Sequence, residues 1–413
     1  MKISMWAAPL GWVVLLAAIA TATASEMQLT LSAAGVARLH CPVSVQLDVP
    51  THLSADEAES LVQLRHAVLQ NAQHTALAQV VPIHRDGVLH GMSFHWVEAK
   101  LSPRETRTYA VRPAVLDSMD AFHFQDGDDW RDLLYGKQGV WRHMIAYDPN
   151  RAEETYKTYH HIYGFHAEPF ITKGPGGLYP HHRGLFFGWV ETTASGNAYN
   201  FWYRTKKQRD SQRHETYRRQ FEAAGIVIGR AASVTRWVGD DGIVVGRDHR
   251  HYTAWVQPEG VHLLDLQITI ESVAGNMVLD GDSAHAGVQF RADQEVANRK
   301  DATYIFPAEV EGGEEDNWTN LNWATVRFAI KGHPYAVMHI DHPDNPRPII
   351  YNTRNYGRFG SFFQKTVKAG EPLKIKYRLI VIDAERFDDL EREDFERRYR
   401  SYVQPVQVTL VTK

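Results

Sequence analysis

The chain has 413 residues, of which 44% are hydrophobic, 11% aromatic and 23% charged, and its formal net charge is −4. This is ordinary globular composition, with enough length for one large or two medium domains. The charge balance is not basic, and the sequence holds no base-reading motif and no platform of interleaved basic and aromatic residues. We therefore expect no nucleic-acid partner.

The first 24 residues are predicted to be a signal peptide. Lys2 supplies a positive start, residues 11–20 are apolar, and Ala-Thr-Ala at 22–24 fits a cleavage site before Ser25. An uncleaved anchor is the alternative, but the apolar run is short for a membrane span, and no later segment reaches about 18 apolar residues. We expect export to the periplasm or the exterior, with cleavage near Ala24 and no span in the mature chain.

Residues 25–116 are predicted to form a small N-terminal module. Four segments there alternate between apolar and polar residues, as half-buried strands do, and their spacing suggests an Ig-like β-sandwich. Only residues 54–70 have a helical pattern. Cys41 is the only cysteine, so no intrachain disulfide can form, and we expect it to be a small buried apolar residue rather than a reactive thiolate.

Residues 117–383 are predicted to form the main domain, after an acidic, irregular boundary segment. Strand-like segments follow one another with little helical periodicity, until residues 384–413 give a charged surface helix and a tail. More than ten strands in one domain indicate an all-β fold, either a large two-sheet sandwich or a barrel.

Two segments gather polar side chains of the kinds that bind and act on ligands. His181, His182 and Arg183 stand together between a glycine-rich turn and an aromatic strand. In residues 284–292, His285, Gln289 and Arg291 share one strand face with a glycine, while apolar residues take the other face. This pattern favours the floor of a polar groove, where a ligand approaches the backbone at the glycine; a plain solvated face is the alternative.

Two other segments are weaker candidates. Asp341 and His342 end a strand at a turn, a usual place for functional groups held by a rigid scaffold. His214 and Glu215 lie in the basic run 203–220, which would attract an anionic substrate such as a uronate or a sulfated glycan, unless it is merely a solvated loop.

No strong metal or nucleophile motif is present: HExxH, GxSxG, P-loop and GxGxxG signatures are all missing. A site for a single divalent transition metal, assembled from His181 or His182 with His214 and His285, stays open because imidazoles suit zinc, copper, iron or nickel. No other cofactor is expected.

Six passages, in order, resemble the PmoA-like family of exported proteins. They are TYKTYHHIYGF, TKGPGGLYPHHRGLFFGW, HETY, DGDSAHAGVQFRA, DHPDNP and NYGRFGSFF, within residues 120–383. The family's "methane oxygenase" label does not transfer, because methane monooxygenase subunits cross the membrane several times. The resemblance implies instead a β-rich domain close to the galactose-mutarotase-like supersandwich, by fold-level analogy.

The resemblance also implies a set of polar motif residues. They are His181, His182, Arg183, His214, Glu215, His285, Gln289, Arg291, Asp341, His342 and Arg358. Many members carry an acidic residue where this chain has His285, so a Glu-based mechanism is not carried over.

Together these observations predict an exported carbohydrate-active enzyme that acts on an acidic or oxidised glycan. We expect proton abstraction beside a carboxylate or carbonyl, giving β-elimination or epimerisation, with hydrolysis next. His181, His182 or His285 would be the base, Glu215 or another histidine the acid, and Arg183 or Arg291 would stabilise the developing charge. The remaining motif residues would bind substrate. The alternatives are a glycan-binding protein without catalysis and a structural surface protein; the oligomeric state is not predicted.

Overall fold

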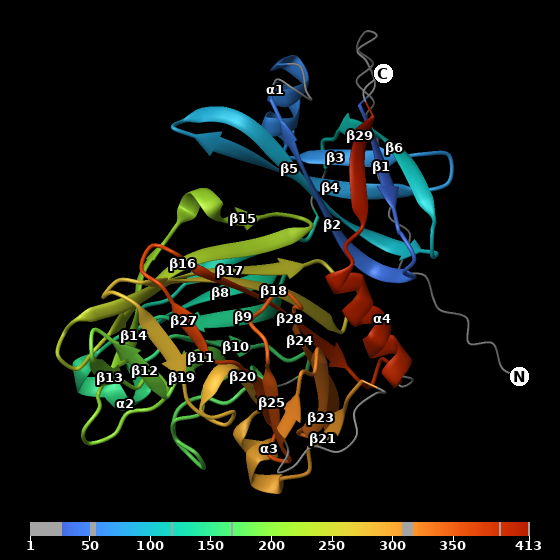
Figure 1. Cartoon of the computed structure of the whole chain (residues 1–413). Coiled ribbons are helices and arrows are strands. Elements are labelled where there is room, and N and C mark those ends of the chain that lie inside the picture. Colours follow the sequence, from blue (N-terminus) through green and yellow to red (C-terminus); the bar gives the residue numbers. More distant parts are fainter. Residues whose placement is uncertain are drawn as a thin grey trace, which may run out of the picture.

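The computed structural model describes most of the chain after residue 26 (Figure 1). The described ranges are 27–49, 55–116, 119–166, 168–307, 317–387 and 390–411. The fold is all-β, as predicted: large antiparallel sheets dominate, and the few helices are short. The predicted signal peptide lies outside the described residues. Within them, no helix combines the length and apolar character needed to cross a bilayer.

The N-terminal module is one continuous seven-stranded sheet, where a small Ig-like sandwich was expected. In spatial order its strands are β2 (Arg38–Asp48), β5 (Val88–Leu101), β4 (Thr75–Arg85), β3 (His66–Gln70), β6 (Thr106–Pro113), β1 (Gln28–Ser32) and β29 (Gln407–Val411). Helix α1 (Ala55–Leu64) forms within the predicted helical passage. The predicted C-terminal tail contains a strand of this sheet. Strand β29 pairs antiparallel with β1 and brings the two ends of the described chain together.

The larger unit contains two nine-stranded sheets, here called sheet 1 and sheet 2. Sheet 1 runs β22 (Asn317–Thr319), β25 (Ile350–Arg354), β26 (Arg358–Phe362), β20 (Ala286–Arg291), β11 (Leu185–Trp189), β10 (Tyr159–Ile162), β9 (Gln138–Met144), β8 (Trp130–Tyr135) and β7 (Phe122–Asp126). Sheet 2 runs β14 (Ser211–Tyr217), β16 (Ile228–Val238), β17 (Val244–Trp255), β18 (Val261–Ser272), β28 (Leu373–Asp383), β24 (His333–Asp341), β23 (Trp323–Ile330) and β21 (Thr303–Ile305), with β15 (Ala223–Ala224) beside β16.

Smaller elements complete this unit. A four-stranded sheet is formed by β13 (Asn197–Tyr199), β12 (Glu191–Ala194), β19 (Met277–Asp280) and β27 (Lys365–Val367). The helices are α2 (Ala152–Thr155), α3 (Gln294–Arg299) and α4 (Arg392–Val403), with 3₁₀ turns at Pro149–Arg151 and Arg219–Phe221.

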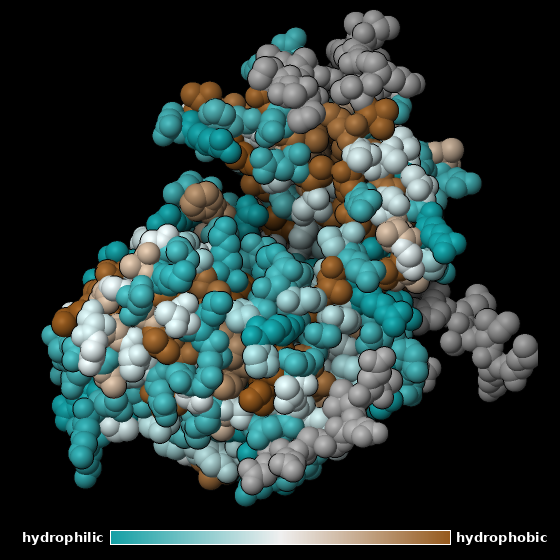
Figure 2. Space-filling view, in the orientation of Figure 1, coloured by the Kyte–Doolittle hydropathy of each residue, from teal (hydrophilic) through white to brown (hydrophobic). Residues whose placement is uncertain are grey.

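The main core lies between sheets 1 and 2. Phe187 and Phe290 from sheet 1 and Leu266 and Val337 from sheet 2 are buried in one hydrophobic cluster. Burying an aromatic or branched side chain of this kind stabilises the fold by about 1.5–3 kcal/mol. Figure 2 shows a mostly hydrophilic outer surface on this unit in the same orientation. The predicted large two-sheet sandwich is therefore confirmed, whereas its likeness to sugar mutarotases stays a prediction.

The N-terminal sheet and α4 pack on the outer side of sheet 2. Leu77 of β4 lies in a cluster with Met338 of β24 and with Phe395, the one fully buried side chain of α4. The Gln79 side-chain oxygen accepts hydrogen bonds from the backbone N–H groups of Val227 and Ile228, at 3.0 and 2.8 Å. The N-terminal module therefore covers the outer side of sheet 2. It does not cover the outer face of sheet 1.

Candidate functional site

The outer face of sheet 1 carries the predicted polar residues of β20. Val288 and Phe290 point into the core, so Gln289 and Arg291 point away from it, as the alternation predicted. Arg291 pairs across the strands with Arg358 of β26. The two guanidinium groups therefore lie on neighbouring strands of one face. Both residues are nonetheless buried, with exposed fractions of 1% and 4%.

Three predicted histidines converge beside this face. The ring centroids of His181 and His182 are 4.7 Å apart, and those of His181 and His285 are 6.3 Å apart. The ring centroid of Tyr203 lies 5.6 Å from that of His181 and 5.7 Å from that of His285, so the three rings form a triangle. Tyr356 lies 6.1 Å from His182. The imidazoles thus form one cluster, and two tyrosines that the sequence did not single out complete it.

Arg183, predicted to bind substrate or stabilise charge, is instead bonded to the backbone. Its Nη1 donates to the carbonyls of Pro180 and His182, at 2.6 and 2.9 Å, and its Nη2 donates to that of Glu153 at 2.7 Å. It is fully buried. We therefore correct its assignment: Arg183 fixes the loop that presents the two histidines through both of its Nη atoms, and only its Nε is buried without a hydrogen-bond partner.

Lys157 is a functional candidate that the sequence analysis missed. It is 2% exposed, its Nζ donates to the carbonyl of Trp202 at 2.6 Å, and it lies 3.6 Å from the ring centroid of Phe186. Burial and the charges of Arg183 and Arg291 hold its pKa well below the usual value. Lys157 belongs to the passage TYKTYHHIYGF, which enters the sequence analysis only through the family resemblance. A lysine with a tyrosine on either side in this passage is the sequence feature that could have indicated a buried functional cation.

Positive charge dominates this group of residues, called here the cationic cluster. Its members are His181, His182, His285, Lys157, Arg291 and Arg358. Nε and Nη2 of both Arg291 and Arg358 are buried without a hydrogen-bond partner. Throughout the described ranges, no carboxylate lies within ion-pair distance of Arg291, Arg358 or Lys157, although the charge of Asp282 acts on Arg358 from farther away. Unpaired buried cations are costly, because low-dielectric surroundings disfavour the charged form. Arginine is a planar, bidentate partner for carboxylates, so the arrangement is suited to an anionic group.

The cationic surroundings also keep the imidazoles neutral. Burial, with Lys157 and Arg291 nearby, lowers the pKa of His181 to about 3, and burial with Arg291 lowers that of His182 further. An anion bound here would raise both pKa values again, because an opposite charge favours the protonated form. The site can therefore couple ligand binding to proton uptake.

His285 differs from its neighbours because it has a carboxylate partner. Its Nδ1 lies 3.0 Å from both carboxylate oxygens of Asp282, three residues earlier in the chain. With the proton on Nδ1, the carboxylate orients the ring and leaves the lone pair of Nε2 for a substrate proton. The side chain is about one-third exposed, so a ligand can reach it.

A cavity of about 250 Å³ continues the same face of sheet 1 across β10 and β9. Lys157 belongs to its lining, so the cavity adjoins the cationic cluster, and Tyr159, His161 and Arg142 also line it. Its size is close to the lower end of small-molecule sites. The arrangement provides room for the uncharged part of a ligand beside an anion-binding cluster.

A family model described as a family of unknown function, DUF6807, matches residues 131–399, about two thirds of the chain. The chain belongs to the DUF6807 family. The matched region includes the whole cationic cluster and leaves out every strand of the N-terminal sheet. It does not address the resemblance to the PmoA-like family, which stays a prediction. No curated protein matches the chain.

Two predicted residues of the DUF6807 region, His214 and Glu215, lie elsewhere. His214, on the edge strand β14, has its ring 5.7 Å from that of His143 on β9. Glu215 pairs with Arg247 at 3.1 Å on the surface of sheet 2. Because these partners hold both side chains away from the cationic cluster, we do not retain Glu215 as the acid. Within the described ranges, no metal-ligand group forms among the predicted histidines.

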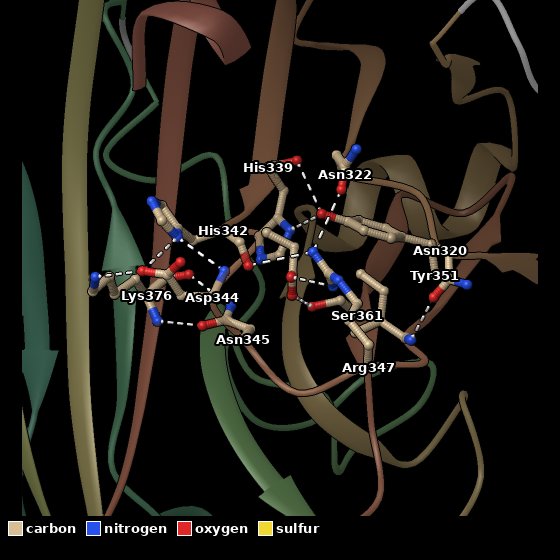
Figure 3. A network of polar contacts seen from close by, with 12 residues as sticks. Asn320, Asn322, His339, His342, Asp344, Asn345, Arg347, Tyr351, Ser361 and Lys376 are labelled. Atoms are coloured by element: carbon tan, nitrogen blue, oxygen red, sulfur yellow. Dashed lines mark hydrogen bonds and ion pairs between the residues drawn. The ribbon is translucent and has the colours of Figure 1, made fainter. Parts of the chain in front are cut away.

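Asp341 and His342 belong to a structural network, part of which Figure 3 shows. Asp341 accepts hydrogen bonds from Arg347 at 2.8 Å and from Ser361 at 2.9 Å, and so joins β24 to β26 inside the sandwich. Burial raises its pKa to about 6. His342 accepts from the backbone of Asp344 at 3.2 Å, within the predicted turn. The prediction that these two residues bind substrate is therefore not supported by their positions.

The structure explains the glycine at position 287 by a close strand contact, whereas the sequence predicted the approach of a ligand. Its φ is +82°, and a Cβ there would lie 1.9 Å from the carbonyl oxygen of Ser361 on β26. The missing side chain therefore allows β26 to approach β20 closely, and it is not explained by the approach of a ligand. We expect Gly287→Ala to lower the free energy of unfolding by at least about 2 kcal/mol, from backbone strain and steric overlap. Urea unfolding would measure this loss, with Gly196→Ala, which also has a positive φ but no neighbouring atom within 4 Å, separating the two causes.

Proposed function

We propose that this DUF6807 protein is an exported carbohydrate-active enzyme that removes a proton beside the carboxylate of an acidic or oxidised glycan. The supporting observation is the pair Arg291 and Arg358, buried on one sheet face with unpaired N–H groups and with no carboxylate partner among the described residues. Such a pair is complementary to a carboxylate, whose charge it would neutralise. Neutralisation makes the neighbouring C–H group more acidic, which a proton-abstracting enzyme requires.

The roles of the residues follow from their surroundings. With the ligand's carboxylate at Arg291 and Arg358, His285 is the base, because Asp282 orients its ring. The C–H electron pair moves into an enolate-like form stabilised by the two arginines. In β-elimination, that pair forms the C=C bond while the C–O bond to the leaving sugar breaks. In epimerisation, a proton returns to the opposite face of the same carbon.

The leaving oxygen, or the epimerised carbon, also needs a proton donor. His181 becomes one when the bound anion raises its pKa, and Tyr203 lies beside both His181 and His285. Arg183 takes part only indirectly, through the loop that it fixes. Hydrolysis is less well supported, because the usual pair of carboxylic acids is not found in the described part of this cluster.

A second candidate function is glycan binding without chemistry. The observation that favours it is the low pKa of His181 and His182, since in the free protein neither imidazole holds a proton to donate at neutral pH. Both candidates predict an anionic ligand, and they differ in what the imidazoles do once it has bound.

Turnover of oligouronates by the mature protein tests the proposal, with the unsaturated product followed by ultraviolet absorption and the epimer by NMR. We expect His285→Ala, and the double variant with His182→Ala, to lower kcat by about 10²–10⁴-fold, as loss of a general base does. Affinity for the oligouronate should change far less. His249→Ala is the matched control, because His249 also pairs with a carboxylate, Glu271 at 3.3 Å, but on sheet 2.

The outcomes separate the candidates. Binding that needs Arg291 but never gives a product would establish a binding protein. Tight binding of neutral glycans only, or an unchanged rate in His285→Ala, would refute the proposed mechanism.

A further inference from the structure

We propose that His166, His333 and Glu385 form a binding site for one divalent transition-metal ion, with Asp383 beside them. The site is independent of the proposed enzymatic function. It involves the loop after β10, the first residue of β24 and the segment after β28, so three separate parts of the chain meet there. Potential ligand atoms of His166, His333 and Glu385 all lie within 4.8 Å of one another.

The two imidazoles and the two carboxylates are already close to one another. The rings of His166 and His333 are stacked, with centroids 3.9 Å apart and planes 8° apart. His333 Nδ1 lies 2.9 Å from Glu385 Oε1, and His166 Nε2 lies 3.3 Å from Asp383 Oδ1. Nitrogen and oxygen donors in such a set suit zinc, nickel or copper better than calcium or magnesium, which prefer oxygen alone.

Atoms without hydrogen-bond partners support the assignment. His166 Nε2 is buried and makes no hydrogen bond, despite its proximity to Asp383. Asp383 is 1% exposed, and its Oδ2 also has no hydrogen bond, although Arg386 Nε lies 3.3 Å away. A cation between the imidazoles and the carboxylates would take up these lone pairs.

The local charge also favours a cation. Asp383 and Glu385 bring two negative charges, while Arg386, the cation that the structure places beside them, is shared with Glu259 at 2.7 Å. His333 is partly exposed and Glu385 is exposed, so an ion can enter from solvent. Asp383 also accepts a hydrogen bond from the backbone N–H of Glu385 at 3.1 Å, which holds the segment after β28 in place.

A metal here would link the loop after β10 to the ends of β24 and β28, and so cross-link sheets 1 and 2. The connection between β10 and β11, which contains His166, also contains His181 and His182. We therefore expect the ion to stabilise the fold, because a ligand that binds only the native state raises the free energy of unfolding.

Isothermal titration of the untagged, chelator-treated mature protein with Zn²⁺ tests this site. We expect one equivalent to bind and to raise the Tm. His333→Ala and Glu385→Gln should each weaken Zn²⁺ binding by at least about tenfold and remove the Tm shift. Both side chains are at the surface, and far-UV circular dichroism would verify that the variants fold.

Two controls locate the ion. His249→Ala removes the imidazole of another His–Glu pair, on sheet 2, and His285→Ala alters the cationic cluster; both should keep Zn²⁺ binding. The proposal is overturned by a protein that binds no Zn²⁺, by binding unchanged in both His333→Ala and Glu385→Gln, or by loss confined to His285→Ala.

Discussion

Replacing Arg291 with methionine should weaken binding of an anionic ligand by about a hundredfold, yet leave the free energy of unfolding within about 1 kcal/mol of the original protein or raise it. Arg291 donates to Gln289 Oε1 at 2.8 Å and to the carbonyl of Phe290 at 3.0 Å, but its Nε and Nη2 have no partner. Charge-assisted hydrogen bonds to a ligand contribute about 1.5–3 kcal/mol, whereas an unpaired buried cation destabilises the free protein.

Arg250 provides the matched control, because it is equally buried but paired. Its Nε lies 2.5 Å from Asp248 Oδ1, and both side chains are fully buried. Arg250→Met leaves the Asp248 carboxylate without its partner cation, so we expect a loss of about 3–5 kcal/mol. Urea unfolding of both variants measures the contrast, and titration with an oligouronate measures the affinity.

Similar destabilisation by the two variants would mean that Arg291 is a structural cation, and the argument for an anion site would fail. Unchanged ligand affinity in Arg291→Met would have the same meaning. The prediction therefore tests whether the unpaired guanidinium groups are kept for a ligand or for the fold.

Strand β20 shows what the local sequence pattern can predict about the site. The alternation of apolar and polar residues in 284–292 placed Gln289 and Arg291 on one face, and the structure confirms that arrangement. Period-2 alternation predicts faces reliably, because neighbouring side chains in a strand point in opposite directions. It does not say what lies opposite, and the strand that faces Gly287 became visible only in the assembled sheet.

Lys157 and Asp341 show where local pattern fails. Lys157 lies far from His181 in the sequence, and only the pairing of β10 with β11 brings their segments together. Asp341 ends its strand as predicted, but the side chain faces Ser361 inside the sandwich. Strand ends suggest functional groups in general. Which face a terminal residue takes depends on how the two sheets pack, and that is a property of the whole domain.

The largest expected effect of pH is a steep loss of stability in mild acid. Apart from His182 of the cationic cluster, six histidines of the described chain are buried with a lowered pKa, chiefly because burial disfavours the charged imidazolium. They are His95, His143, His160, His161, His262 and His339. In the unfolded chain each would titrate near its ordinary pKa of about 6.5. Below that pH the unfolded state therefore binds more protons than the native state, and stability falls as pH falls.

The magnitude follows from linkage. At pH 5, a histidine that stays neutral in the native state and has an unfolded pKa of about 6.5 costs about 2 kcal/mol. Six such penalties are comparable with the whole free energy of unfolding of a typical domain, about 5–15 kcal/mol. We therefore expect acid unfolding with a midpoint between about pH 5 and 6, which tryptophan fluorescence across a pH series would detect.

One substitution isolates the cause. Burial alone lowers the pKa of His262 to about 3, and its ring lies 4.3 Å from that of Phe165. His262→Phe keeps an aromatic ring in that position but cannot be protonated. Near pH 8 its free energy of unfolding should match that of the original protein within about 1 kcal/mol, and at pH 5 it should be higher by about 2 kcal/mol. If the two proteins lose stability in parallel as the pH falls, proton uptake by buried histidines is not what limits stability in acid.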